Sequence, residues 1–229
     1  MERKIIKTDD GSVTIHLPDW NEQYHSKHGA VQEARHVFLK MGLYYYLESF
    51  KTSNLSILEI GFGTGLNAFL TLLESERLKQ KITYTGVEAY PVSSEEVVQL
   101  NYPEACEAKE KASIFQKLHE ISWGEKTEIS PYFNLTKQQK KFDEIKDEAL
   151  YDLIYFDAFG ARVQPELWTE EIFSIMYRAL KENGVLVTYA AKGSVRRAML
   201  ATGFQVEKLP GPPGKREMLR AVKKQAEAR

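Results

Sequence analysis

The chain has 229 residues, 43% of them hydrophobic and 28% charged, and a net charge of −1. This length suits one domain, or one domain with a small additional segment, and this composition excludes a disordered chain. Its single cysteine, Cys106, excludes a disulfide framework and a cysteine-rich metal site, and the five histidines show no metal-ligand spacing. No apolar run approaches the roughly 18 residues of a membrane helix, and the N-terminus lacks a signal peptide's apolar segment. We therefore expect a cytoplasmic protein with neither a membrane span nor a metal.

The first 50 residues precede the first buried-strand pattern, so residues 1–50 are expected to form an N-terminal extension packed on a core domain of residues 51–229. Two short runs of β-branched residues flank Asp9–Ser12 and predict a hairpin. Leu and Tyr at helical spacing then predict a helix from Val31 to Phe50.

From residue 55 onward, short apolar strands alternate with helices. Strands are predicted at Leu55–Ile60, Lys81–Glu88, Thr127–Leu135, Tyr151–Asp157, Val185–Ala190, Phe204–Lys208 and Glu217–Val222. Helices are predicted at Leu66–Leu78, after Ser93–Ser94, at Tyr102–Glu120, at Pro165–Leu180 with Asn183–Gly184 as its C-cap, and at Val195–Thr202. The alternation predicts an α/β fold with a mostly parallel, doubly wound sheet that ends in a C-terminal antiparallel hairpin.

A glycine loop follows the first core strand. Gly61, Gly63 and Gly65 open a helix whose backbone N–H groups favour a negative or polar ligand group. Leu66 stands where a dinucleotide fingerprint has its third glycine, which disfavours a nicotinamide cofactor. Glu59 adds a carboxylate before the loop, so the loop suits the ammonium and carboxylate of S-adenosyl-L-methionine (SAM).

Two acids stand at the ends of later strands. Glu88 ends one strand, where a carboxylate accepts hydrogen bonds from ribose hydroxyls. Asp157 ends another and is followed by the aromatic Phe159, whereas Asp152 at that strand's start is expected on the surface. Because the carboxyl ends of parallel strands share one edge of a sheet, these acids and the glycine loop predict a nucleoside-cofactor site.

Six sequence blocks span nearly the whole chain: Tyr24–Leu39, Leu58–Asn67, Gly86–Pro91, Tyr151–Phe159, Pro165–Phe173 and Gly214–Leu219. In this order they resemble the bacterial tRNA 5-methylaminomethyl-2-thiouridine methyltransferases in their stand-alone form. The resemblance implies a Rossmann-like class I SAM-dependent methyltransferase that methylates the aminomethyl group of the wobble uridine of tRNA. Some members carry a flavin oxidoreductase domain; here the chain ends at Arg229, so we expect no FAD domain and a separate enzyme that installs the aminomethyl group.

The resemblance also implies roles for individual residues. Asp157 and Phe159 are expected to be catalytic: the carboxylate orients the amine, and the ring either stacks on the base or packs in the core. An acid that ends the preceding strand in the family corresponds to Asn134, expected beside the adenine. The full set of expected cofactor contacts is Tyr24, Glu33, Glu59, Gly61, Gly63, Thr64, Gly65, Asn67, Glu88, Asn134 and Asp157.

The C-terminal segment is basic. Residues 185–229 contain ten Lys and Arg against three Glu, a local charge of +7. Such a segment either binds nucleic acid or forms an ordinary solvated surface. On the first interpretation the phosphate contacts are Arg196, Arg197, Lys215 and Arg216.

Three other functions stay open at this point. An aminopropyltransferase of the spermidine-synthase type shares the glycine loop, but it needs further acids, and only Asp157 and Asp152 suggest themselves. A small-molecule or protein N-methyltransferase would use the same scaffold. A SAM-binding regulatory or RNA-binding module without catalysis is disfavoured by the retained Asp157 and the complete glycine loop.

Overall fold

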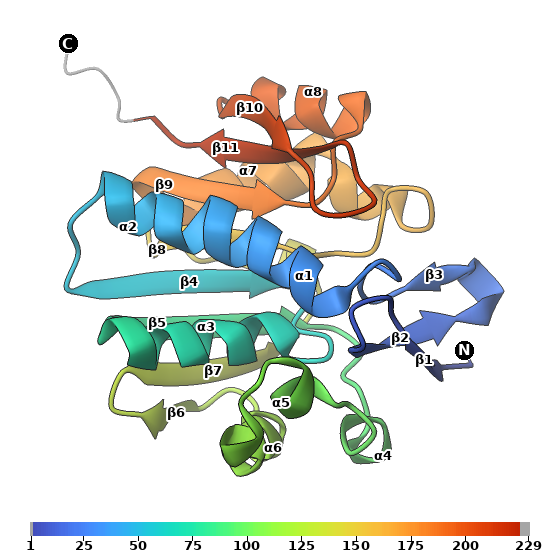
Figure 1. Ribbon diagram of the computed structural model, residues 1–229. Helices are drawn as coiled ribbons and strands as arrows, with labels where there is room; N and C mark the ends of the chain where they lie inside the picture. Colours follow the sequence, from blue (N-terminus) through green and yellow to red (C-terminus); the bar gives the residue numbers. More distant parts are fainter. Residues whose placement is uncertain (1, 225–229) are drawn as a thin grey trace.

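The computed structural model describes residues 2–224, and its centre is an eight-stranded sheet with the order β10-β11-β9-β8-β4-β5-β7-β6 (Figure 1). Its strands, in chain order, are β4 (Asn54–Ile60), β5 (Lys81–Glu88), β6 (Lys126–Ser130), β7 (Phe133–Gln139), β8 (Tyr151–Phe156), β9 (Leu180–Thr188), β10 (Gln205–Pro210) and β11 (Glu217–Val222). Strands β7, β5, β4, β8 and β9 run parallel, while β6, β10 and β11 pair antiparallel with their neighbours. The predicted fold class, including the C-terminal hairpin, is confirmed.

Helices cover both faces of this sheet, as a doubly wound fold requires (Figure 1). They are α1 (Ala30–Ala34), a π-helical stretch (Arg35–Tyr44), α2 (Tyr45–Ser49), α3 (Leu66–Leu78), α4 (Ser94–Val97), α5 (Tyr102–Ala105), α6 (Ala112–Glu120), α7 (Glu170–Ala179) and α8 (Gly193–Ala201). One apolar core lies beneath α1 to α3 and α6, and a second lies beneath α7 and α8 on the other face. The predicted bounds of α3 and β5 are matched residue for residue.

The N-terminal segment forms a small antiparallel sheet of β1 (Lys4–Lys7), β2 (Val13–Leu17) and β3 (Glu22–Gln23), and the predicted hairpin joins its first two strands. The helix that follows runs continuously from α1 to α2 across the central sheet (Figure 1). It packs closely on β9, since a Cβ at Gly42 would lie only 3.0 Å from Val187 Cγ2. The small sheet is thereby held beside the carboxyl ends of the central strands.

The predicted strand Thr127–Leu135 is wrong. The chain instead forms β6 and β7, which turn back on each other at Pro131 and Tyr132. Proline has no backbone N–H to donate to a sheet ladder, so Pro131 interrupts this polar, weakly alternating run and favours a turn. The parallel core strand β7 therefore ends at Gln139 rather than at Leu135.

Three further expectations differ from the structure. The helix predicted from Tyr102 is interrupted, because Glu107 has a left-handed φ of 59° between α5 and α6. Asn183 does not cap α7, which ends at Ala179; it lies with φ of 63° in the irregular start of β9. Asp152 is 94% buried and accepts hydrogen bonds from Ser56 N at 2.8 Å and Lys181 Nζ at 2.9 Å, so it ties strands together at the edge opposite the site.

Candidate active site

A cavity of about 1350 Å³ opens at the carboxyl ends of β4, β5 and β8. The predicted features meet there, because Gly61 and Gly63, Glu88 and Asp157 all line its wall. Typical small-molecule sites occupy roughly 300–1,000 Å³. The cavity is therefore large enough for more than one ligand.

The glycine loop lies directly against the end of β8. Gly61 has a φ of 86°, and a Cβ at this position would lie 2.7 Å from the Asp157 carbonyl oxygen. Only glycine therefore lets the loop approach Asp157 in this way. Glu88 holds the next part of the loop, since its Oε2 accepts from Gly63 N at 3.0 Å and its Oε1 accepts from Tyr90 N at 2.9 Å.

Behind the cavity wall, one amide joins two acids. Asn67 Nδ2 donates to Glu59 Oε1 and to Asp157 Oδ2, both at 2.9 Å. Glu59 is fully buried and Asn67 is 98% buried, and neither lines the cavity. Both are expected cofactor contacts, and the structure places their side chains in the core, at the carboxyl end of β4 and in the first turn of α3. They act on the cavity through Asp157.

Thr64 and Gly65 also lie beneath the cavity surface instead of on it. Thr64 Oγ1 accepts from Tyr102 OH at 3.1 Å and lies 2.8 Å from His25 Nε2. Burial lowers the pKa of His25 to about 4, so the ring that contacts Thr64 is neutral at pH 7. This chain of hydrogen bonds joins the glycine loop to the N-terminal segment.

Among the acids that line the cavity, Asp157 has a pKa that is strongly raised. Burial, and next the negative charge of Glu33, raise its pKa to about 7, against the opposing effects of the Asn67 hydrogen bond and the Lys215 charge. Burial also raises the pKa of Glu59 well above its ordinary value, and the Asp157 charge adds to this effect. At neutral pH, Asp157 thus exchanges between its acid and its carboxylate, which a general base requires.

Aromatic side chains form the cavity wall beside Asp157. Phe159 meets Tyr24 at a centroid distance of 4.9 Å and Trp20 at 5.8 Å, both edge to face. Trp168 is 95% buried, and its indole N–H donates to the Phe159 carbonyl at 2.7 Å. Phe159 is therefore held at the cavity by the N-terminal sheet on one side and the 3₁₀ turn Pro165–Trp168 on the other.

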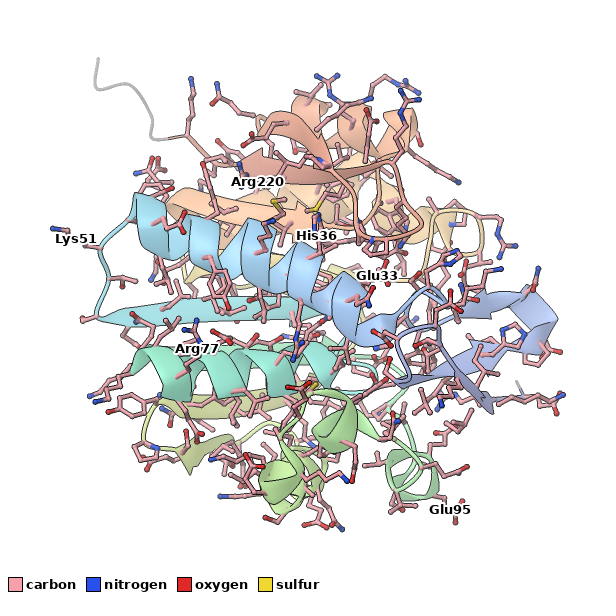
Figure 2. The ribbon with its side chains drawn as sticks, in the orientation of Figure 1. Glu33, His36, Lys51, Arg77, Glu95 and Arg220 are labelled. Carbon is pink, nitrogen blue, oxygen red and sulfur yellow. The ribbon has the colours of Figure 1, made fainter. Side chains whose placement is uncertain are left out.

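Glu33 and Lys215, which lie 182 residues apart, form an ion pair on the cavity wall. Glu33 projects from α1, the start of the long helix (Figure 2), and its Oε2 accepts from Ser26 N at 2.7 Å. Lys215 Nζ also lies 3.9 Å from the centroid of the Tyr189 ring. Lys215, one of the expected phosphate contacts, therefore has its ammonium paired within the site.

The other predicted phosphate contacts lie outside the main cavity. Arg197 and Arg216 are exposed and Arg196 is half-buried, and within residues 2–224 none of them forms an ion pair. Arg216 lines a shallow depression next to the main cavity, together with Lys192. Arg216 is therefore available to an anionic partner next to the main cavity, whereas Arg196 and Arg197 lie on α8 and line neither hollow.

Asn134 does not reach the site. It is the second residue of β7 and pairs with Thr83, whereas Gln139 at the other end of β7 pairs with Glu88. At about 3.3 Å per residue, Asn134 lies about 16 Å from the carboxyl edge. Its placement at a strand end followed from the incorrect strand prediction; the acid that follows β7 into the cavity is Asp143.

Several cavity residues were not anticipated from the sequence, and most lie in loops without a motif. Arg162 donates to the carbonyls of Trp20 and Asn21 at 3.0 and 2.9 Å, which links the loop after Phe159 to the N-terminal sheet. Acids are more numerous than expected, since Glu22, Asp143, Glu166 and Glu171 also line the cavity. Within residues 2–224, no cluster of three metal-ligating side chains occurs and no helix is long and apolar enough to cross a membrane.

These residues fit SAM. Glu88 presents a carboxylate at the end of β5 for ribose hydroxyls, and Asp157 supplies negative charge beside the glycine loop for a cationic ligand. Tyr24 and Phe62 add apolar wall on the same side. The fold and the site together define a class I SAM-dependent methyltransferase.

Comparisons with known proteins agree. Residues 110–224 match the model of a family described as S-adenosyl-L-methionine-dependent methyltransferase, and the chain belongs to this family. SAM is therefore its cofactor.

Curated relatives include the tRNA 5-methylaminomethyl-2-thiouridine biosynthesis bifunctional protein MnmC of Aromatoleum aromaticum (30% identical, 95% of this chain, 35% of the relative) and that of Hydrogenovibrio crunogenus (29%, 94% and 33%). The chain thus spans about a third of their length. Among solved structures, MnmC2 from Aquifex aeolicus has a TM-score of 0.78 at 24% identity, covering 98% of this chain and 71% of that one. Spermidine synthase from Thermotoga maritima has a TM-score of 0.55 at 16% identity, covering 96% and 68%. At these identities both structures support the fold alone.

Proposed function

We propose that this protein methylates the primary amine of an aminomethyl group on the wobble uridine of tRNA, forming 5-methylaminomethyl-2-thiouridine. The observation that carries the proposal is Asp157, a carboxyl group with a pKa of about 7 at the wall of a large cavity beside the glycine loop. The names of the MnmC relatives support the choice of tRNA as substrate.

An amine substrate explains why a raised pKa is useful at Asp157. An alkylammonium has an ordinary pKa near 10, so proton transfer to an unperturbed aspartate, about 6.5 units lower, costs about 9 kcal/mol. With the pKa of Asp157 at about 7, the same transfer costs about 4–5 kcal/mol. The burial of Asp157 and the Glu33 charge therefore roughly halve the cost of producing a neutral, nucleophilic amine.

The remaining steps follow from the positions of the site residues. One proton passes from the substrate ammonium to Asp157, and the freed nitrogen lone pair then takes the methyl group. When bound, SAM supplies that methyl group on a sulfonium, which leaves as a neutral thioether. The hydrogen bond from Asn67 holds the Asp157 carboxyl in place. Phe159 lines the cavity next to Tyr24 and provides the aromatic ring on which a flipped base stacks.

Arg196, Arg197 and Arg216 serve as phosphate contacts in this proposal, because none of them forms an ion pair within the described part of the chain and Arg216 lies next to the main cavity. Phosphate contacts position the RNA, while the cavity selects the modified base.

Mass spectrometry of tRNA nucleosides tests the proposal. Incubation of tRNA carrying 5-aminomethyl-2-thiouridine with SAM and the protein should convert the nucleoside to its N-methyl product. An Asp157→Asn variant provides the matched negative control. Because acids line the cavity, a parallel reaction with decarboxylated SAM and putrescine tests aminopropyl transfer. Aminopropyl transfer without tRNA methylation would refute the proposal.

A further inference from the structure

The ammonium group of Lys215, a residue of the protein itself, lies at the wall of the cavity. The loop between β10 and β11 descends beside the first turns of the long helix (Figure 1), and Lys215 on this loop pairs with Glu33 on that helix. Figure 2 shows Glu33 at this place, where α1 begins beneath the loop. Lys215 Nζ lies over the Tyr189 ring, 3.9 Å from its centroid.

These surroundings are what a primary alkylammonium requires in a desolvated site. The Glu33 carboxylate neutralises its charge, and the Tyr189 ring face attracts the cation. Both groups are held in place: Ser26 N donates to Glu33 Oε2 at 2.7 Å, and Tyr189 OH donates to the Ala158 carbonyl at 2.8 Å. Carboxylate and ring therefore keep their positions without Lys215.

Glu33 needs a cation whenever it is ionised. Its side chain is only 7% exposed, and a buried carboxylate without a partner is strongly unfavourable. The cavity's arginines are committed elsewhere, Arg3 to Glu96 and Arg162 to Glu22. Lys215 is 33% exposed on a flexible four-carbon stem, so its ammonium can move into water once another cation takes its place.

The subsite adjoins the reacting group. The charges of Glu33 and Lys215 both act on Asp157, and all three residues line the same cavity. An ammonium bound at Glu33 therefore lies in the same cavity as the group that would receive its proton and within range of its charge.

We propose that Glu33 and the Tyr189 ring form a binding subsite for a primary alkylammonium group, which Lys215 fills until a substrate amine replaces it. The assignment of this amine to the aminomethyl group of tRNA rests on the proposed function. The ammonium subsite itself can be tested without turnover.

The binding test uses methylammonium as the probe. Titration of [13C]methylammonium, followed by NMR, should show binding to Lys215→Met at least tenfold tighter than to the wild type, because the internal competitor is gone. Binding should be lost in the double variant Lys215→Met/Glu33→Gln. Lys208→Met, which removes the exposed ion pair with Glu217 on the same hairpin, should match the wild type. Equal binding by folded Lys215→Met and the wild type would overturn the proposal.

The kinetic test begins with the wild-type enzyme. Methylammonium should inhibit the wild-type enzyme competitively with aminomethyl-tRNA, whereas tetramethylammonium at equal ionic strength should not. Glu33→Gln should raise the KM for this tRNA at least tenfold and leave the SAM Kd within twofold. An unchanged KM, or equal inhibition by both cations, contradicts the subsite. If methylammonium binds as expected but the wild type does not methylate tRNA, the proposed function fails and the ammonium subsite stands.

Discussion

The hydrogen bond from Asn67 to Asp157 makes a quantitative prediction about pH dependence. Asn67→Ala removes the donor that stabilises the Asp157 carboxylate, so the pKa of Asp157 should rise further. A hydrogen bond to a charged group is worth about 1.5–3 kcal/mol, of which water entering the space left by the amide recovers part. A net loss of about 1.4 kcal/mol corresponds to one pKa unit.

The measurement is kcat/KM for aminomethyl-tRNA between pH 6 and 9. Because the pKa of Asp157 is raised, its carboxylate is present only above about pH 7, and wild-type activity should rise through that pH. In Asn67→Ala this rise should move to higher pH by about one unit. The free energy of unfolding should also fall by about 2–4 kcal/mol, since Asn67 is 98% buried between two acids.

A matched variant separates the two effects. The side-chain amide of Asn101 also forms two hydrogen bonds: its oxygen accepts from Val13 N at 2.9 Å, and its nitrogen donates to the Gly11 carbonyl at 3.0 Å. Neither hydrogen bond involves Asp157. Asn101→Ala should lower stability without moving the pH dependence. If the profile of Asn67→Ala coincides with that of Asn101→Ala, then Asn67 does not set the basicity of Asp157 and the reasoning is refuted.

Four further predictions concern Asp157, Glu88 and the arginines of α8. Asp157→Asn should lower kcat by about 10²–10⁴-fold with little change in SAM affinity by calorimetry, and residual activity above a tenth of wild type would exclude a proton-accepting role. The same variant should gain about 1–2 kcal/mol of stability at pH 8 in urea unfolding and almost nothing at pH 4, because the raised pKa of Asp157 removes stability as the pH rises from the unfolded-state value of 3.8 to the folded-state value of about 7. Glu88→Ala should weaken SAM binding at least tenfold, since the variant loses the carboxylate and the anchor of Gly63; unchanged affinity would contradict its role. Charge reversal of Arg196 and Arg197 should weaken tRNA binding and reduce the slope of log binding constant against log salt concentration by about two units. Charge reversal of Lys51, at the far end of the long helix (Figure 2), should change neither quantity. An equal effect of both reversals would show that the attraction is non-specific.

The parts of the fold that the sequence predicted best were those specified by local patterns. The spacing of apolar residues and the helix- or strand-breaking residues at the ends predict both the type and the bounds of strand β5 and helix α3, and the structure has these bounds. Prediction failed where a local signal was weak: β6 and β7 are polar strands joined by a tight turn. That single error misplaced Asn134 and concealed Asp143.

The sequence by itself determined that a glycine loop and the acids Glu88 and Asp157 would share one edge of a parallel sheet, because all three follow the carboxyl ends of strands. Only the tertiary structure decided which side chains face the cavity and how their charges interact. It turns Glu59 and Asn67 inward, although they flank the same loop as Gly61. It also brings Lys215 to Glu33 across 182 residues, and no local pattern encodes that contact. The basicity of Asp157 depends on this burial and these neighbours, so it is a property of the folded chain.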